Sequence, residues 1–191
     1  MLTFLIFSLS AATVLAMAGN QTGKKATSPD PKNMELMKPG LEHEQIMKMA
    51  GNWNASCKFW MDADEQAVEA TGTLNAKVIL DGRYLEGEFK ATIKGQPFAG
   101  RSLNGFNRVS KQFQYVWYDS MGTGITSLQG PAGADGKTVT YTGAMECAMK
   151  GHVTLRFVEA CQSDDQLTHV MYQTKDGIEK KTMEITYNRR K

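Results

Sequence analysis

Cysteine and histidine are scarce in this sequence of 191 residues, which contains three of each. The cysteines are Cys57, Cys147 and Cys161, so no Cys-x-x-Cys spacing occurs, and the few histidines add no zinc-ligand pattern. An odd number of thiols in a chain of this length is not a disulfide framework either. We therefore expect no metal site and no network of disulfide bonds.

An excess of one charge is also lacking, because 22 Lys and Arg face 20 Asp and Glu, for a net charge of +2. Nucleic-acid binding normally needs a clustered basic face, and the densest basic stretch here is the short tail 189–191. No Gly-x-Ser-x-Gly, His-Glu-x-x-His, phosphate-loop or dinucleotide motif occurs. The sequence predicts no nucleic-acid partner, no catalytic residues and no cofactor, and it gives no oligomeric state.

The one long uncharged run lies at the N-terminus. Residues 2–18 carry no charge and end in Ala16-Met17-Ala18, the small-x-small pattern typical of a signal-peptidase site. No Lys or Arg precedes the run, which departs from the usual signal peptide, and its length is marginal for a membrane span. We expect residues 1–18 to be a signal peptide, the protein to be periplasmic or secreted, and the mature chain to have no membrane span. The alternative is an uncleaved anchor.

A polar stretch separates this run from the rest of the chain. We interpret residues 19–38 as a flexible linker, because their first part is polar and has no periodicity. Residues 39–191 then form one domain of ordinary length. A short helix is expected at residues 41–50, since Pro39 and Gly40 precede it and Gly51 follows it.

After Gly51 the apolar residues recur at every second position, which is the period of a β-strand. In residues 83–93, for example, Leu85, Phe89 and Ile93 share one face. Similar runs are separated by turn signals such as Asp81-Gly82. The pattern predicts about nine or ten strands with short connections.

These strands have one apolar face each and no helices between them, which favours antiparallel pairing. A barrel leaves no exposed sheet edge, so we predict an all-β, antiparallel up-and-down β-barrel of the lipocalin-like kind, with a short N-terminal helix before its first strand. A sandwich is the alternative. In a hairpin of residues 139–160, Cys147 lies beside the turn and Cys161 about 30 Å away, too far for a disulfide. Cys57 is expected to be a buried thiol.

Several segments carry a resemblance to known proteins. Gly51-Asn52-Trp53, at the switch from helix to strand, resembles the Gly-x-Trp signature of lipocalin-like barrels. There the Trp closes one end of the barrel and a basic residue near the C-terminus packs over it, a role that the resemblance gives to Arg189 or Arg190.

Longer segments resemble the domain of unknown function 1579 family over residues 39–190. They include residues 81–85 (DGRYL), 95–100 (GQPFAG), 117–124 (WYDSMGTG) and 181–187 (KTMEITY). The sequence departs from the family's pattern at Phe106, where Tyr is common, and around Cys147. The resemblance implies a calycin-like β-barrel with no established activity.

Residues 117–124 are the most informative candidate site. Asp119 has the parity of Tyr115 and Trp117, which places a carboxylate at the end of an apolar face. A buried carboxylate needs a donor or a wet cavity. One interpretation is a polar anchor of a ligand pocket at the barrel mouth, with Thr123 in the turn that follows. The other is that Asp119 accepts hydrogen bonds from the backbone amides of that turn.

Arg83 and His169 are further candidates. Arg83 has the parity of the apolar face, so it either reaches Asp119 or an anionic ligand inside the barrel, or lies in the turn and faces solvent. His169 is expected to face inward, as a haem ligand or as a hydrogen-bonded core residue. His152 is expected to be exposed, and His43 to be exposed or to cap the short helix.

We therefore predict an exported barrel that binds a small apolar or amphipathic molecule. The expected ligand-binding residues are Arg83, Tyr115, Trp117, Asp119, Thr123 and His169. Two alternatives come from other functional classes. One is a filled barrel that acts through its surface as an interaction module, and the other is an enzyme or haem-binding protein centred on Asp119 or His169.

Overall fold

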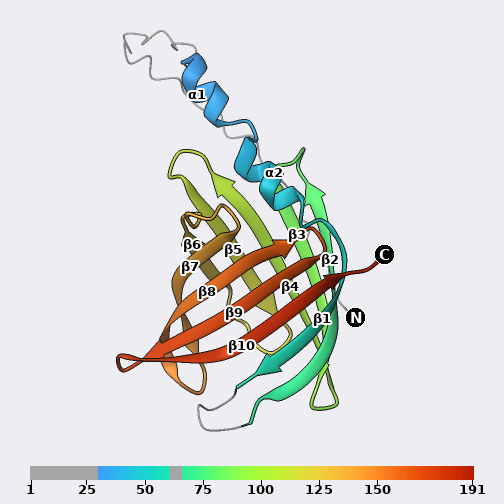
Figure 1. Cartoon of the computed structure of the whole chain (residues 1–191). Helices are drawn as coiled ribbons and strands as arrows, with labels where there is room; N and C mark the ends of the chain where they lie inside the picture. Colours follow the sequence, from blue (N-terminus) through green and yellow to red (C-terminus); the bar gives the residue numbers. More distant parts are fainter. Residues whose placement is uncertain (1–29, 61–65) are drawn as a thin grey trace, which may run out of the picture.

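The computed structural model describes residues 30–60 and 66–191, so the predicted signal peptide and residues 19–29 of the predicted linker lie outside the described residues. Two short helices, α1 (Pro31–Leu36) and α2 (Leu41–Met47), precede the strands (Figure 1). Helix α2 confirms the expected helix, although it ends before Ala50. Helix α1 lies within the predicted linker. It begins where the Asp30 side chain accepts a hydrogen bond from the Lys32 amide at 2.9 Å and a proline occupies its first turn.

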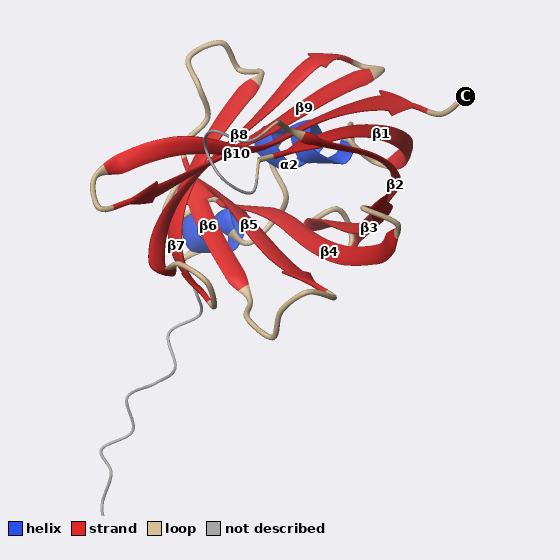
Figure 2. Ribbon diagram, turned by 90° about the horizontal axis from the view of Figure 1, so that it is seen from below, coloured by secondary structure: helices blue, strands red, loops and turns tan. Residues whose placement is uncertain are grey.

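Ten strands follow in the described part of the chain. They are β1 (Gly51–Phe59), β2 (Val68–Ile79), β3 (Tyr84–Ile93), β4 (Gln96–Asn107), β5 (Gln112–Asp119), β6 (Thr126–Gly130), β7 (Thr138–Cys147), β8 (Gly151–Ser163), β9 (Gln166–Lys175) and β10 (Ile178–Arg189). Each strand pairs with its neighbours in sequence, β1 also pairs with β10, and all pairs are antiparallel. This confirms the closed up-and-down barrel. Figure 2, seen from the end opposite the helices, shows the strands surrounding the interior.

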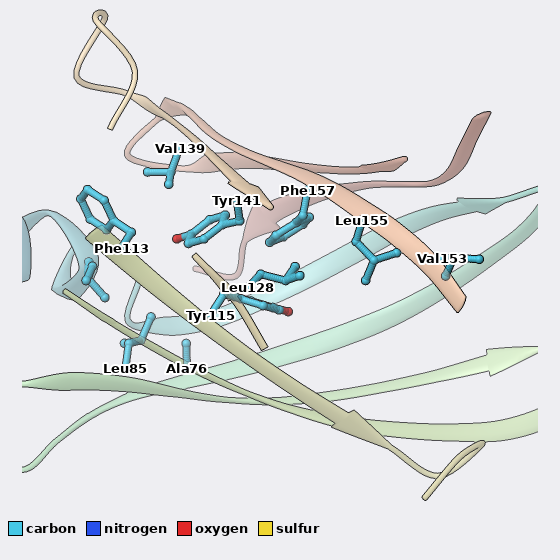
Figure 3. Packing of buried hydrophobic residues seen from close by; sticks show 11 residues of the cluster. Ala76, Leu85, Phe113, Tyr115, Leu128, Val139, Tyr141, Val153, Leu155 and Phe157 are labelled. Carbon is cyan, nitrogen blue, oxygen red and sulfur yellow. The ribbon is translucent and has the colours of Figure 1, made fainter. Parts of the chain in front are cut away.

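The alternation predicted from sequence places the expected residues inside the barrel. Leu85 and Phe89 are buried on β3, and Tyr115, Tyr141 and Phe157 pack together with ring centroids 4.8 to 5.8 Å apart (Figure 3). The same alternation would place Val78 and Leu80, at the end of β2, on the inward face, but both are exposed. Val78 still pairs with Leu85 in the last residues of β2, whereas Leu80 lies beyond the strand and has a φ of 49°. Alternation therefore fails where the strand ends.

Helix α2 lies at the end of the barrel where β1 begins, and Trp53 fills that end. Trp53 is fully buried, and its indole Nε1 donates to the Met49 carbonyl at 3.0 Å. The Arg189 guanidinium lies 4.0 Å from the centre of the Trp53 ring and donates to the carbonyls of Ala50 and Lys48 at 2.7 and 2.8 Å. The packing expected from the resemblance is confirmed, with Arg189 in that role.

His43 acts as a cap but is buried, not exposed. Its Nδ1 accepts a hydrogen bond from the Gly40 amide at 3.0 Å, and its ring meets Phe106 edge-on. Burial lowers the pKa of His43. The sequence therefore predicts correctly that His43 caps the helix. Its burial could not be predicted, because it results from the packing of α2 against the barrel.

The cysteines lie as the hairpin geometry predicts. Cys57, Cys147 and Cys161 are free thiols, Cys147 pairs with Gly151 beside the β7–β8 turn, and Cys161 pairs with Leu167 at the far end of β8. Cys57 is buried, and burial raises its pKa to about 11, so it is an unreactive thiol at neutral pH.

Candidate functional site

A cavity of about 240 Å³ occupies the half of the barrel interior away from α2. Its position follows from its lining, which includes Phe59 at the end of β1, Phe98 near the start of β4 and Asp119 at the end of β5. The walls are largely aromatic, with further rings from Phe89, Tyr115, Trp117, Phe157 and Tyr187. The apolar side chains that point inward from nearly every strand therefore fill one part of the barrel and line a cavity in the other.

Trp117 and Asp119 form one side of the cavity mouth. Trp117 Nε1 donates to Asp119 Oδ2 at 2.7 Å, and Asp119 Oδ1 accepts from the Met121 amide at 2.9 Å. Asp119 therefore accepts a hydrogen bond within the turn, as one interpretation expected, and it also lines the cavity, whereas its role as the polar anchor of a ligand stays a prediction. A Cβ at Gly100 would overlap the Trp117 ring, so glycine on β4 allows the indole to lie against the strand.

His169 lies deeper in the barrel and contacts Glu159, a residue that was not among those predicted from the sequence. Nε2 of His169 and Oε2 of Glu159 are 3.0 Å apart, and the two side chains are only 9% and 7% exposed. The Tyr141 hydroxyl donates to the other Glu159 oxygen at 3.4 Å. Neither Nε2 nor Oε2 makes a well-aligned hydrogen bond to any described residue. The pair is therefore a buried polar contact in a mostly aromatic interior.

The inward orientation of Glu159 could have been predicted from the sequence. Glu159 has the parity of Val153, Leu155 and Phe157 on β8, all of which face inward. His169 lines the cavity, whereas Glu159 lines a separate pocket of about 390 Å³ near the α2 end. The Glu159–His169 pair thus forms part of the wall between these two hollows.

Arg83 does not join the cavity, and the prediction that it could reach Asp119 is wrong. Arg83 lies in the β2–β3 turn at the α2 end, where its Nη1 donates to the Leu80 carbonyl at 3.2 Å. Its neighbour Tyr84 pairs with Gly105 on β4, while Asp119 pairs with Gly100. Five residues of strand separate these points by about 17 Å. The alternative interpretation, an arginine in the turn, fits the structure.

Thr123 and Met121 also lie outside the cavity lining. Both are exposed in the loop between β5 and β6. Thr126, at the start of β6, lines the cavity where Thr123 was expected. The strand parity that places Trp117 and Asp119 does not continue through the loop, because the chain there leaves the barrel wall.

Three buried tyrosines have strongly raised pKa values. They are Tyr115, Tyr141 and Tyr187, and in each case burial is the main cause, with a further contribution from the nearby Glu159 carboxylate. Both effects disfavour the phenolate, so the folded protein keeps these three hydroxyls protonated.

Alkaline pH should therefore unfold the barrel. An unfolded tyrosine ionises near pH 10, whereas these three resist ionisation when folded, so their contribution to stability is complete below pH 10 and is lost as pH rises above it. We expect phenolate absorbance from these three residues to rise together with the loss of β-sheet circular dichroism. Ionisation of all six tyrosines of the sequence with unchanged circular dichroism would contradict this prediction.

Across residues 30–60 and 66–191, no three or more His, Cys, Asp or Glu side chains are grouped so that they could hold a metal ion. In the same ranges, no helix combines the length and apolar character needed to cross a bilayer.

The chain is similar to one protein family and to several solved structures. The model of a family described as a protein of unknown function (DUF1579) matches residues 38–189. No curated protein gives a match. Among solved structures, Rv2717c from M. tuberculosis is similar with a TM-score of 0.62 and 10% identity, over 81% of this chain and 100% of that chain. The S-type phycobiliprotein lyase CPES from Guillardia theta has a TM-score of 0.57 and 11% identity, over 85% and 99%. At such identities the likeness shows the barrel fold alone.

Proposed function

The chain belongs to the DUF1579 family of proteins of unknown function, and we propose that it binds a small, largely apolar molecule inside its barrel. The observation that carries this proposal is the cavity of about 240 Å³ with aromatic walls. Pockets for drug-sized ligands measure roughly 300–1,000 Å³, so the ligand is smaller than these. Of the residues predicted from sequence, Tyr115, Trp117, Asp119 and His169 line this cavity.

The alternatives have less support. A solidly filled barrel does not fit a cavity beside Trp117. For the haem alternative, the Nε2 atom of His169 is buried and faces Glu159, so this nitrogen does not point into the cavity. Binding of a small apolar molecule therefore remains the function that the geometry supports best.

The proposal includes export, for which residues 1–18 of the sequence are the support. Expression of the full chain in a bacterial host followed by fractionation and intact-mass measurement tests this part. We expect a mature form that begins at Gly19 outside the cytoplasm. A full-length product retained in the cytoplasm would show that export is wrong without affecting the binding proposal.

Ligand binding is tested with octanol, a neutral molecule with an apolar chain. We expect octanol to bind the purified chain and to raise its unfolding midpoint, since a ligand that binds only the folded state stabilises it by about 2.7 kcal/mol at a hundred times Kd. Isothermal titration calorimetry and thermal unfolding measure both effects.

Two methionine variants locate the binding. Met171→Trp fills part of the cavity from β9, whereas Met149→Trp makes the same change at an exposed position in the β7–β8 turn. We expect Met171→Trp to weaken octanol binding strongly and Met149→Trp to leave it unchanged, with circular dichroism confirming that both are folded. Absence of octanol binding to the folded wild-type chain, or equal binding by both variants, would overturn the proposal.

A further inference from the structure

A second pocket, of about 280 Å³, adjoins the cavity at the barrel mouth. Four lysines line it, Lys150, Lys175, Lys180 and Lys181, and we call it the lysine pocket. Gln173 lines both the lysine pocket and the cavity, so the two hollows share a wall. A ligand in the cavity therefore has the lysine pocket beside it.

Two of these lysines lie on the inward face of the barrel wall. Lys180 pairs with Gln173, and Lys175 pairs with Ile178 across the same β9–β10 hairpin. Directly paired residues, and residues two apart on a strand, share one face of a sheet. Since Gln173 faces the cavity, Lys175 and Lys180 have the same orientation. Deeper in the barrel the inward residues Met171, Met183 and Ile185 are apolar, whereas Lys175 and Lys180 at the mouth carry ammonium groups.

The lysine pocket has an excess of positive charge in the described residues. Lys181 is paired with Glu184 at 2.7 Å, but no ion pair of residues 30–60 and 66–191 involves Lys175 or Lys180. Asp176 is the only acidic residue of the described chain that lines the pocket. The aromatic ring of Trp60 lies 4.4 Å from Lys181 Nζ and gives the pocket an apolar side.

The cavity, unlike the lysine pocket, is lined by no Lys or Arg among the described residues. Its one rim carboxylate, Asp119, already accepts hydrogen bonds from Trp117 and from the Met121 amide. The cavity is thus mostly apolar, and among the described residues the lysines at the mouth outnumber the carboxylates that line the two pockets. Such an arrangement suits a molecule with an apolar body and a single negative end.

We infer that the lysine pocket binds the anionic head group of an amphipathic ligand whose apolar part fills the cavity. This inference rests on the proposed function and assigns its ligand class, a small monocarboxylic acid or a similar anion with an apolar chain or ring. From Lys175 at the mouth to Met171 in the cavity wall, four residues of strand span about 13 Å. A medium-length acyl chain covers such a distance.

Three probes with the same chain and different head groups test the inference: octanoate, octanol and octylamine. We expect octanoate to bind at least about tenfold more tightly than octanol, because a charged hydrogen bond contributes about 1.5–3 kcal/mol, and octylamine to bind most weakly. The preference should shrink as salt is raised toward 1 M, where the screening length falls to about 3 Å. Isothermal titration calorimetry on the full mature chain measures all three.

Matched variants connect the preference to the pocket. Lys175→Gln with Lys180→Gln should reduce octanoate binding about to the level of octanol and leave octanol binding unchanged. Lys77→Gln with Lys111→Gln removes the same charge toward the α2 end of the barrel and should change neither. Because all four lysines are exposed, the variants should fold normally.

The outcomes separate this inference from the proposed function. Equal binding of octanol and octanoate, unaffected by the Lys175 and Lys180 changes, would overturn the inference and leave apolar ligand binding intact. Binding of none of the probes would overturn the proposed function and the inference with it. Tighter binding of octylamine than of octanol would also overturn the inference, because the mouth would then favour a cation.

Discussion

Replacing Trp53 with alanine is expected to lower the free energy of unfolding by about 3–5 kcal/mol, the usual cost of removing a large buried aromatic side chain. Trp53 is fully buried at the α2 end, donates to the Met49 carbonyl and lies beneath Arg189. The substitution leaves a cavity and removes the surface on which the arginine stacks. Urea denaturation followed by circular dichroism measures the change.

Trp60 provides the matched control in the same chain. It also lies under a cation, Lys181, but it is only partly buried and stands just beyond β1. We expect Trp60→Ala to cost about 1 kcal/mol or less, the usual range for an exposed cation–π contact. Equal losses for Trp53→Ala and Trp60→Ala would show that closure of the α2 end does not depend on Trp53.

Replacing His169 with alanine is expected to cost a similar amount, about 3–5 kcal/mol, because removing one partner of a buried ionisable pair leaves the other without compensation. Glu159 would then keep only the Tyr141 hydroxyl, at 3.4 Å, among the contacts of its carboxylate. Adding Glu159→Gln to His169→Ala should restore part of the stability, since a neutral amide is cheaper to bury than a carboxylate. Denaturation of both variants measures this coupling.

The exposed His152–Glu146 pair is the control for this prediction. Its atoms are 2.8 Å apart, but the two side chains are 67% and 78% exposed. We expect His152→Ala to cost at most about 1 kcal/mol, as exposed ion pairs do. If His169→Ala costs no more than His152→Ala, the buried pair does not stabilise the barrel.

Much of the barrel could be predicted because its information is local. Each strand alternates between solvent and interior, so Leu85, Phe89 and Phe157 are assigned inward from their neighbours alone. The same parity places Tyr115, Trp117 and Asp119 along one wall of the cavity. These assignments need no knowledge of which strands pair, because a residue's face is set within its own strand.

The errors fall where a strand ends or where two strands must be compared. Arg83, Thr123 and Leu80 lie at turns, where the chain leaves the pleated sheet and parity no longer fixes a side chain. Glu159 shows the second kind of failure. Its inward parity was readable, but its significance comes from His169 on the neighbouring strand, and the register Glu159↔His169 is a tertiary fact.

The sequence by itself determined that this chain forms antiparallel strands with an aromatic inward face, because two-residue periodicity and short turns are properties of neighbouring residues, and it favoured a closed barrel over a sandwich without deciding between them. Only the tertiary structure decided that the interior keeps a cavity, that Glu159 meets His169, and that lysines gather beside the mouth. Each of these depends on the register between strands and on the volume left between side chains from opposite walls, and neither quantity is encoded within one strand.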